Sequence, residues 1–194
     1  MNILVLNAGS SSLKYQVIEM PSKVVKCVGL IERIGMIDSV FTHEKGEKKY
    51  SEKTKIKDHK FGLQKIAKTL LDNEVGVIKT VEEIDSVGHR VVHGGSKFSK
   101  TALATKDVKK NIRELFDLAP LHNPANLTGI EIAETIFTAA KQIAIFDTAF
   151  HQTMPREAYQ YAIDNSYLND YKIRAYGFHG TSHKYVSEKA IEYL

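Results

Sequence analysis

The first residues that could do chemistry form a polar segment, residues 7–14, directly after the apolar run at residues 3–6. The segment combines glycine, three consecutive serines and Lys14, the residue types that hold phosphates through backbone N–H groups and one cation. Alternation in the following residues predicts a strand with Ser12 and Lys14 on one face. A Walker loop needs two glycines and a helix after the lysine, so this segment differs from one. Taken alone, it reads as a polar turn between strands.

A second candidate, residues 88–95, is a predicted strand that runs into two glycines. Alternation places Arg90 with Val92 on one face and His89 with His93 on the other. Arg90 beside Val92 could offer a carboxylate a bidentate cation next to an apolar wall, and the two histidines could ligate a metal. The alternatives are a structural arginine paired with an acid and two histidines that make ordinary hydrogen bonds.

Three further candidates lie at the ends of predicted elements. His122 precedes a helix start, where free N–H groups favour an anion. Asp147 follows an apolar strand, and the carboxyl edge of a sheet is where open α/β folds bind ligands such as Mg²⁺. His179 and His183 surround another helix start, which a turn with polar caps explains equally well.

Hydrophobic periodicity predicts the elements that carry these residues. A helix is expected around residues 63–71, another from the cap Thr105 to Phe116, and a third with Asn123 as cap and Pro124 at its first position. A fourth helix should begin at Thr181 or Ser182 and reach Leu194. The predicted strands span residues 3–6, 12–17, 24–31, 86–92 and 142–146. This order of strands and helices indicates an α/β fold.

Composition limits the possible classes of function. The 194 residues are 43% hydrophobic, enough for a substantial core, and no apolar run approaches a signal peptide or a membrane span. We therefore expect a cytoplasmic protein with no membrane partner. Cys27 is the single cysteine, which excludes an internal disulfide and a cysteine metal cluster.

The net charge of +4 does not indicate a nucleic-acid partner. Residues 44–60 hold seven lysines against four acids, with interspersed signs, no arginine and almost no aromatic residue to stack on bases. This segment is predicted to be a solvated surface hairpin.

In combination, five segments resemble the acetate kinase family closely. They have the order and spacing of that family's signature segments and span nearly the whole chain: NAGSSSLKY from Asn7, GHRVVHGG from Gly88, LAPLHNP from Leu118, FDTAFH from Phe146 and YGFHGTSHKYV from Tyr176. Propionate kinases share most of these segments, so the resemblance indicates the reaction more firmly than the acyl substrate.

The resemblance implies the α/β fold of acetate and sugar kinases, Hsp70 and actin, which is ribonuclease H-like, with a mixed sheet flanked by helices. Members have two such domains around a cleft, are usually homodimers and are about twice as long, so this chain is expected to be an N-terminal half. Residues 1–150 would form the first domain, with a lysine-rich surface insertion near 36–60, and residues 151–194 would begin a second, truncated domain.

The resemblance also implies a role for each matching residue. Asn7 would help to hold Mg²⁺ (or Mn²⁺), and Lys14, Ser10 and Ser12 would lie near the phosphates of ATP or ADP. Arg90 would bind the carboxyl or phosphoryl group, His122 and His179 would hydrogen-bond the phosphoryl oxygens, and Asp147 would order Mg²⁺ or the attacking carboxylate. Val92, Leu121 and Phe178 would enclose the acetate methyl group.

These roles imply direct in-line transfer of the γ-phosphoryl group of ATP to acetate, giving acetyl phosphate and ADP. The isolated chain is expected to be inactive or nearly so, because it would supply one wall of the cleft. Three other interpretations remain: a kinase for propionate or another short-chain acid, a non-catalytic phosphate-binding half that acts with a partner, and a metal-dependent hydrolase built on the eight histidines.

Overall fold

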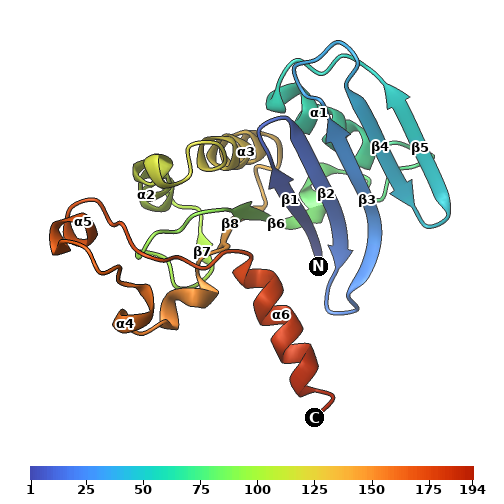
Figure 1. The fold of residues 1–194 in the computed structure, drawn as a ribbon. Helices are drawn as coiled ribbons and strands as arrows, with labels where there is room; N and C mark the ends of the chain where they lie inside the picture. Colours follow the sequence, from blue (N-terminus) through green and yellow to red (C-terminus); the bar gives the residue numbers. More distant parts are fainter.

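A computed structural model describes residues 1–194, and its centre is one eight-stranded sheet of order β5-β4-β3-β2-β1-β6-β8-β7 (Figure 1). The strands are β1 (Asn2–Ala8), β2 (Ser12–Glu19), β3 (Val24–Glu32), β4 (Val40–Lys45), β5 (Lys48–Lys53), β6 (Ile84–Val91), β7 (Ala102–Leu103) and β8 (Lys141–Phe146). Strands β1 to β5 form an antiparallel meander, whereas β1, β6 and β8 are parallel. The mixed α/β sheet confirms the predicted fold class.

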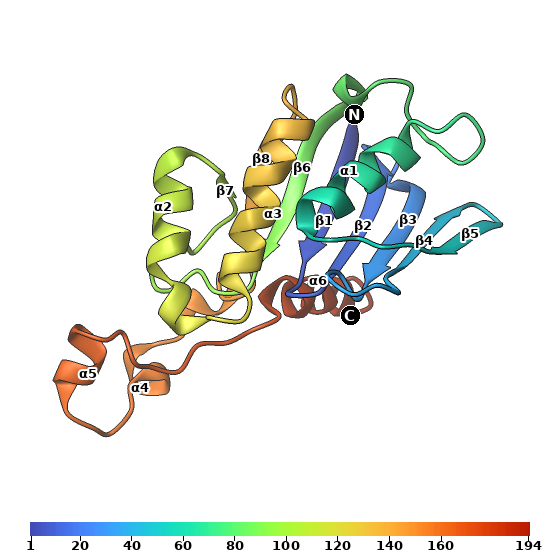
Figure 2. The ribbon, with the colours of Figure 1, turned by 90° about the horizontal axis from the view of Figure 1, so that it is seen from above.

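The longer helices lie mainly on one face of this sheet. The helices are α1 (His59–Leu70), α2 (Lys106–Glu114), α3 (Asn123–Ile136), α4 (Arg156–Tyr159), α5 (Asn165–Asn169) and α6 (Gly180–Ile191), with short 3₁₀ turns at Val81–Glu83, Phe116–Leu118 and Phe150–Thr153. Helices α1 and α3 pack side by side against the sheet, and α2 packs against α3 (Figure 2). Helix α6 lies on the other side of the sheet, where it contacts β8 (Figure 2).

The core forms where alternate strand residues meet α1 and α3. Leu13, Tyr15 and Val17 of β2 are each at most 2% exposed, as the alternation predicted, and Leu4 and Leu6 of β1 are equally buried. Their neighbours in sequence point to the other face and remain partly exposed or exposed. Burial raises the pKa of the Cys27 thiol in this core to about 11, so the thiol stays protonated at neutral pH.

One predicted helix cap agrees with the structure, and three predicted helix boundaries differ from it. Thr105 Oγ1 accepts the Val108 N–H and caps α2, as predicted. Phe116, expected in that helix, lies in the 3₁₀ turn that follows it. Asn123 is the first residue of α3 rather than its cap, because its side chain bonds the backbone of His93 and leaves the cap position to His122. Helix α6 begins at Gly180, slightly before the predicted start.

The lysine-rich segment contains the hairpin of β4 and β5, which forms one edge of the sheet. All residues of β5 except Glu52 are exposed, so this edge is solvated as expected.

Residues 151–194 pack differently from the rest of the chain. Both clusters of buried hydrophobic residues lie between Leu4 and Phe146, and Gly180 is the single buried residue after position 150. No helix is both long enough and apolar enough to cross a membrane.

Candidate functional site

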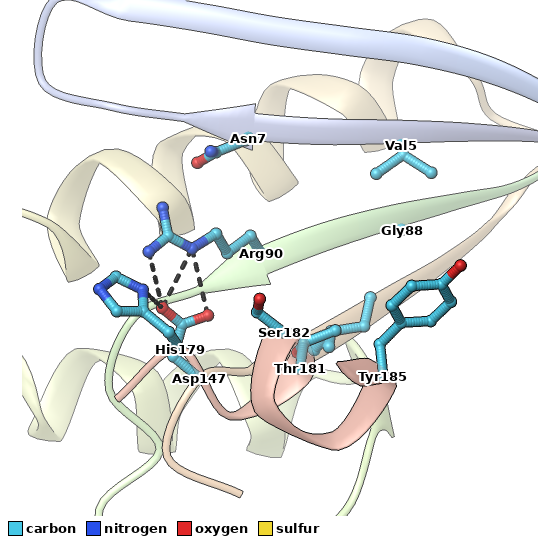
Figure 3. A pocket seen from close by; sticks show the side chains of 10 residues that line it. Val5, Asn7, Gly88, Arg90, Asp147, His179, Thr181, Ser182 and Tyr185 are labelled. Carbon is cyan, nitrogen blue, oxygen red and sulfur yellow. Dashed lines mark hydrogen bonds and ion pairs between the residues drawn. The ribbon is translucent and has the colours of Figure 1, made fainter. Parts of the chain in front are cut away.

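A cavity of about 630 Å³ lies at the carboxyl ends of the parallel strands β1, β6 and β8. Its lining joins these strand ends to the start of α6 and brings together four predicted site residues, Asn7, Arg90, Asp147 and His179 (Figure 3). The other lining residues are Val5, Gly88, Ile145, Thr181, Ser182 and Tyr185. The carboxyl edge of a parallel sheet is the usual place for a ligand in an α/β fold.

Strand alternation explains why these side chains share the cavity. On β1, Leu4 and Leu6 face the helices, so Val5 and Asn7 face the other side. On β6, Val87 and His89 are buried, whereas Arg90 points with Gly88 toward the cavity. The predicted opposition of Arg90 and His89 is therefore confirmed.

Arg90 and Asp147 form a close ion pair at the centre of the lining. Arg90 Nε lies 3.1 Å from both carboxylate oxygens of Asp147, and Nη2 lies 2.7 Å from Oδ2. The Asp147 side chain is only 4% exposed and that of Arg90 is 36% exposed. Arg90 is thus paired with an acid, as one of the two interpretations of the sequence expected. Arg90 still has N–H groups on Nη1 and Nη2 that this pair does not use, so it can also bind an anion.

The start of α6 closes the cavity from the other side. Gly180 N–H donates to the Asp147 carbonyl at 2.8 Å, and a side chain at Gly180 would meet that oxygen at 2.4 Å, so this close approach requires glycine. The N–H groups at a helix start and the helix dipole favour an anion. Thr181, Ser182 and Tyr185 line the cavity here, although the sequence assigned them no role; their spacing on one helical face was the available signal.

His179 caps α6 in a left-handed backbone conformation, with φ of 54°. Its Nδ1 lies 3.8 Å from Asp147 Oδ2, and its side chain is 70% exposed. His179 therefore stands at the mouth of the cavity, beside the ion pair, with most of the ring available to a ligand (Figure 3).

Apart from Asn7, the predicted phosphate segment lies outside the cavity lining, in the turn between β1 and β2 and the first residues of β2. Lys14 is exposed and lies opposite Asn7 in the strand register. Ser10 is exposed and Ser12 is partly exposed. The turn is held by its own backbone and by His59 of α1, whose Nε2 donates to the Gly9 carbonyl at 2.6 Å. Sequence analysis missed His59.

The predicted methyl pocket and His122 also lie outside the cavity lining. Leu121 is 74% exposed, Phe178 is 40% exposed and Val92 is partly exposed. His122 is exposed at the start of α3. The structure therefore brings four of the predicted residues together and leaves the others on the surrounding segments.

Two buried asparagines of α3 fix these turns, and the sequence had suggested neither role. Asn126 Oδ1 accepts the Val92 N–H at 3.0 Å, and its Nδ2 donates to the Ala8 carbonyl at 2.7 Å. Asn123 makes the corresponding pair of bonds with the N–H and carbonyl of His93. The ends of β1 and β6 are thereby held to the start of α3.

The two histidines considered as metal ligands have structural partners. His89 Nε2 donates to Gln142 Oε1 at 2.8 Å, since the Gln142 amide group donates to two carbonyls. Burial lowers the pKa of His89 to about 4. His93 Nδ1 accepts the Gly95 N–H, and burial lowers the pKa of His93 too. No three His, Cys, Asp or Glu side chains lie close enough together to hold a metal ion.

Comparison with known proteins places these observations in a family. A model of the acetokinase family matches residues 2–194. The chain is 59% identical to an acetate kinase of Flavobacterium johnsoniae and 52% identical to one of Thermotoga maritima, each over 194 residues. The whole chain is covered in both cases, but only 49% and 48% of those proteins. The chain thus spans about half the length of these curated relatives.

Solved structures of an acetate kinase and a propionate kinase also match the whole chain. The crystal structure of Porphyromonas gingivalis acetate kinase matches the whole chain and 49% of that protein, with a TM-score of 0.94 and 44% identity. A propionate kinase from Francisella tularensis matches the same shares, with a TM-score of 0.93 and 41% identity.

Proposed function

The chain belongs to the acetokinase family, and on that premise we propose that it forms the N-terminal half of an acetate kinase. The proposed reaction is reversible phosphoryl transfer between ATP and acetate, giving acetyl phosphate and ADP. The observation that carries this proposal is the meeting of Arg90, Asp147, Asn7, His179 and the start of α6 around one cavity. The lining combines a guanidinium, a histidine and a helix start, all groups that bind anionic oxygens.

The proposed mechanism depends on positioning and on electrostatic stabilisation. Acetate is ionised at neutral pH, because its carboxyl group resembles an aspartate side chain with a pKa near ~4, so its oxygen attacks the γ-phosphorus without a general base. Negative charge then spreads over the phosphoryl oxygens. Arg90 offers its unused N–H groups to these oxygens, and His179 and the α6 N–H groups approach them from the opposite wall.

Mg²⁺ fits the oxygen donors of this lining. The Asp147 carboxylate and the Asn7 amide oxygen face the same cavity, and Mg²⁺ in such enzymes commonly takes one or two protein oxygens beside water and phosphate. Asn7 and Asp147 would hold the ion, which when bound neutralises charge on the nucleotide phosphates. Asp147 keeps lone pairs for this role while it orients Arg90.

The surrounding turns are proposed to complete the site. Lys14, Ser10 and Ser12 would contact the nucleotide phosphates, and His122 the transferred group. Val92, Leu121 and Phe178, which come from three separate segments next to the cavity, would enclose the acetate methyl group when the cleft closes. A propionate preference is the alternative, supported by the match to a propionate kinase.

The chain alone is proposed to be inactive, because one wall of a cleft neither excludes water nor clamps both phosphates. The complete enzyme would be a cytoplasmic homodimer. A chimera of this chain with the second half of the Flavobacterium johnsoniae acetate kinase tests these points. Hydroxylamine trapping of acyl phosphate from Mg²⁺, ATP and acetate, propionate or butyrate should detect product with the chimera, most with acetate, and none with the chain alone.

Arg90→Ala in the chimera should lower kcat about 10²- to 10³-fold, the usual cost of one lost transition-state donor. The matched control is Arg113→Ala, since Arg113 pairs with Glu131 on the surface, away from the cavity; it should leave turnover unchanged. A folded chimera that forms no acyl phosphate with any of the three acids would refute the kinase proposal. Turnover by the chain alone that equals turnover by the chimera would refute the half-site proposal.

A further inference from the structure

A second cavity, of about 730 Å³, lies at the opposite end of the same sheet. It is lined by the first residues of β3, by Lys45 at the end of β4, by residues 71–79 after α1 and by Glu83 just before β6. Since β6 carries Arg90 near its other end, the two cavities are separated by roughly 20 Å of strand. The second cavity is thus distinct from the candidate active site.

The lining of this cavity contains lysines that can attract an anion, because they form no ion pair within the chain. Lys26, Lys45 and Lys79 line it, and no carboxylate lies within ion-pair distance of any of them. The two acids of the lining already have donors. Asp72 Oδ1 accepts the N–H groups of residues 74 and 75 at 2.8 and 3.1 Å, and Glu83 Oε1 accepts the Lys79 N–H at 2.7 Å.

Apolar groups lie beside these cations. Val24 and Val25 are 53% and 50% exposed, and Leu71 is 36% exposed, although all three are aliphatic. Val77 and Ile78 continue this surface into the wall of the cavity. The combination of ammonium groups that form no ion pair and exposed aliphatic side chains matches a ligand with an anionic head and an apolar body.

The wall of the cavity is held in place by β4. Lys45 Nζ donates to the Gly76 carbonyl at 2.7 Å, and His43 Nε2 donates to the Val75 carbonyl at 2.9 Å. His43 Nδ1 in turn accepts from the buried Tyr15 hydroxyl at 2.7 Å. Because these bonds fix the loop, a ligand would not have to order it on binding.

We propose that this cavity is a binding site for a small organic anion with an apolar chain, of the chemical class of medium-chain carboxylates. Lys79 and Lys26 hold the carboxylate, since Lys45 is engaged with the Gly76 carbonyl at 2.7 Å, whereas the bond of Lys26 to Asn2 Oδ1 is long, at 3.4 Å. The chain of the ligand lies on Val24, Val25 and Leu71. This inference does not depend on the proposed kinase activity.

Titration of the ¹⁵N-labelled chain with octanoate, followed by amide chemical shifts, tests the proposal. Saturable shifts are expected at residues 24–26 and 71–79, with 1-octanol producing none. The double variant Lys26→Gln/Lys79→Gln should bind octanoate about tenfold more weakly, since two exposed ion pairs are lost. The control Lys106→Gln/Lys110→Gln removes the same charge from exposed positions of α2 and should bind normally.

Arg90→Ala separates the two cavities, because it changes only the candidate active site. Shifts at residues 71–79 that persist in Arg90→Ala support the proposal. It is overturned if the shifts do not saturate, if they spread over the exposed apolar residues after position 150, or if the Lys26/Lys79 variant binds octanoate as tightly as the parent chain.

Discussion

At the residue scale, Asn126 shows how one buried amide fixes a site. It is 3% exposed and joins the Ala8 carbonyl to the Val92 N–H, so it ties the ends of two strands to α3. These two bonds are the hydrogen bonds that the Asn126 side chain makes. Removal of the side chain therefore leaves the buried Ala8 carbonyl and the partly buried Val92 N–H unsatisfied.

Asn126→Ala is expected to lower the free energy of unfolding by about 2–4 kcal/mol, since each unsatisfied buried group costs about 1–3 kcal/mol. Urea denaturation of the chain measures this. Asn111→Ala is the control, because it removes a single exposed hydrogen bond to Lys97 and should cost less than about 0.5 kcal/mol. If the two variants lost equal free energy of unfolding, the Asn126 bonds would contribute no more than one exposed hydrogen bond.

His89 gives a prediction for pH. Its folded-state pKa is about 4, below the ordinary value of 6.5, because burial disfavours the charged ring. Protons therefore bind the unfolded chain first as the pH falls, so the contribution of His89 to stability is complete above pH ~6.5 and is lost between ~6.5 and ~4.

His89→Gln, which keeps an amide donor for Gln142 but cannot titrate, should flatten this part of the pH dependence. Between pH 7 and pH 4 the free energy of unfolding of the variant should fall by about 3 kcal/mol less than that of the parent chain. Urea titrations at several pH values make the comparison. If the free energy of unfolding fell equally with pH in the variant and in the parent chain, the fold would not be holding His89 neutral.

At the element scale, α3 lies unusually close to β1. A side-chain carbon at Gly129 would approach the Ala8 Cβ to 2.9 Å, and both atoms are attached directly to backbone. Alanine normally stabilises a helix interior by up to ~1 kcal/mol relative to glycine. Here neither neighbour can rotate away, so the helix itself would have to move.

We therefore expect Gly129→Ala to destabilise the chain by about 1–3 kcal/mol, the usual cost of overpacking, in spite of the gain in helix propensity. Thr128→Ala is the matched control, because Thr128 lies on the exposed face of the same helix. It should be neutral or slightly stabilising. Thermal unfolding followed by circular dichroism measures both variants, and a higher Tm for Gly129→Ala would contradict the packing argument.

At the scale of the whole molecule, stability is distributed unevenly. The hydrophobic clusters end at Phe146, whereas residues 151–194 contribute one buried glycine and many exposed aromatic side chains. A segment with few buried contacts opens locally at low free-energy cost. The boundary near residue 150, which the sequence predicted, is consistent with this distribution and stays a prediction.

Brief digestion with proteinase K should therefore cleave within residues 151–194 first and leave a resistant fragment that ends near residue 150. Mass spectrometry identifies the fragment. Early cleavage inside α1 or α3, with residues 151–194 intact, would place the stable unit elsewhere.

The sequence by itself determined the α/β class and the main strands and helices, and it predicted Asn7, Arg90, Asp147 and His179 as site residues, which the structure brings to one cavity. Alternation and helical periodicity are local properties, so a strand such as β6 already reveals that Arg90 and His89 face opposite sides. The family followed from short segments whose order and spacing are readable without a structure.

Only the tertiary structure decided which of these residues meet. The pairing of Arg90 with Asp147, the bonds of Asn126 to two strand ends and the anchoring of the Gly9 turn by His59 join residues 34 to 118 positions apart. Such contacts depend on the register of parallel strands and on the docking of α3, which no local pattern specifies. The close packing that excludes a side chain at Gly129 arises in the same way, because it exists only once the helix lies on the sheet.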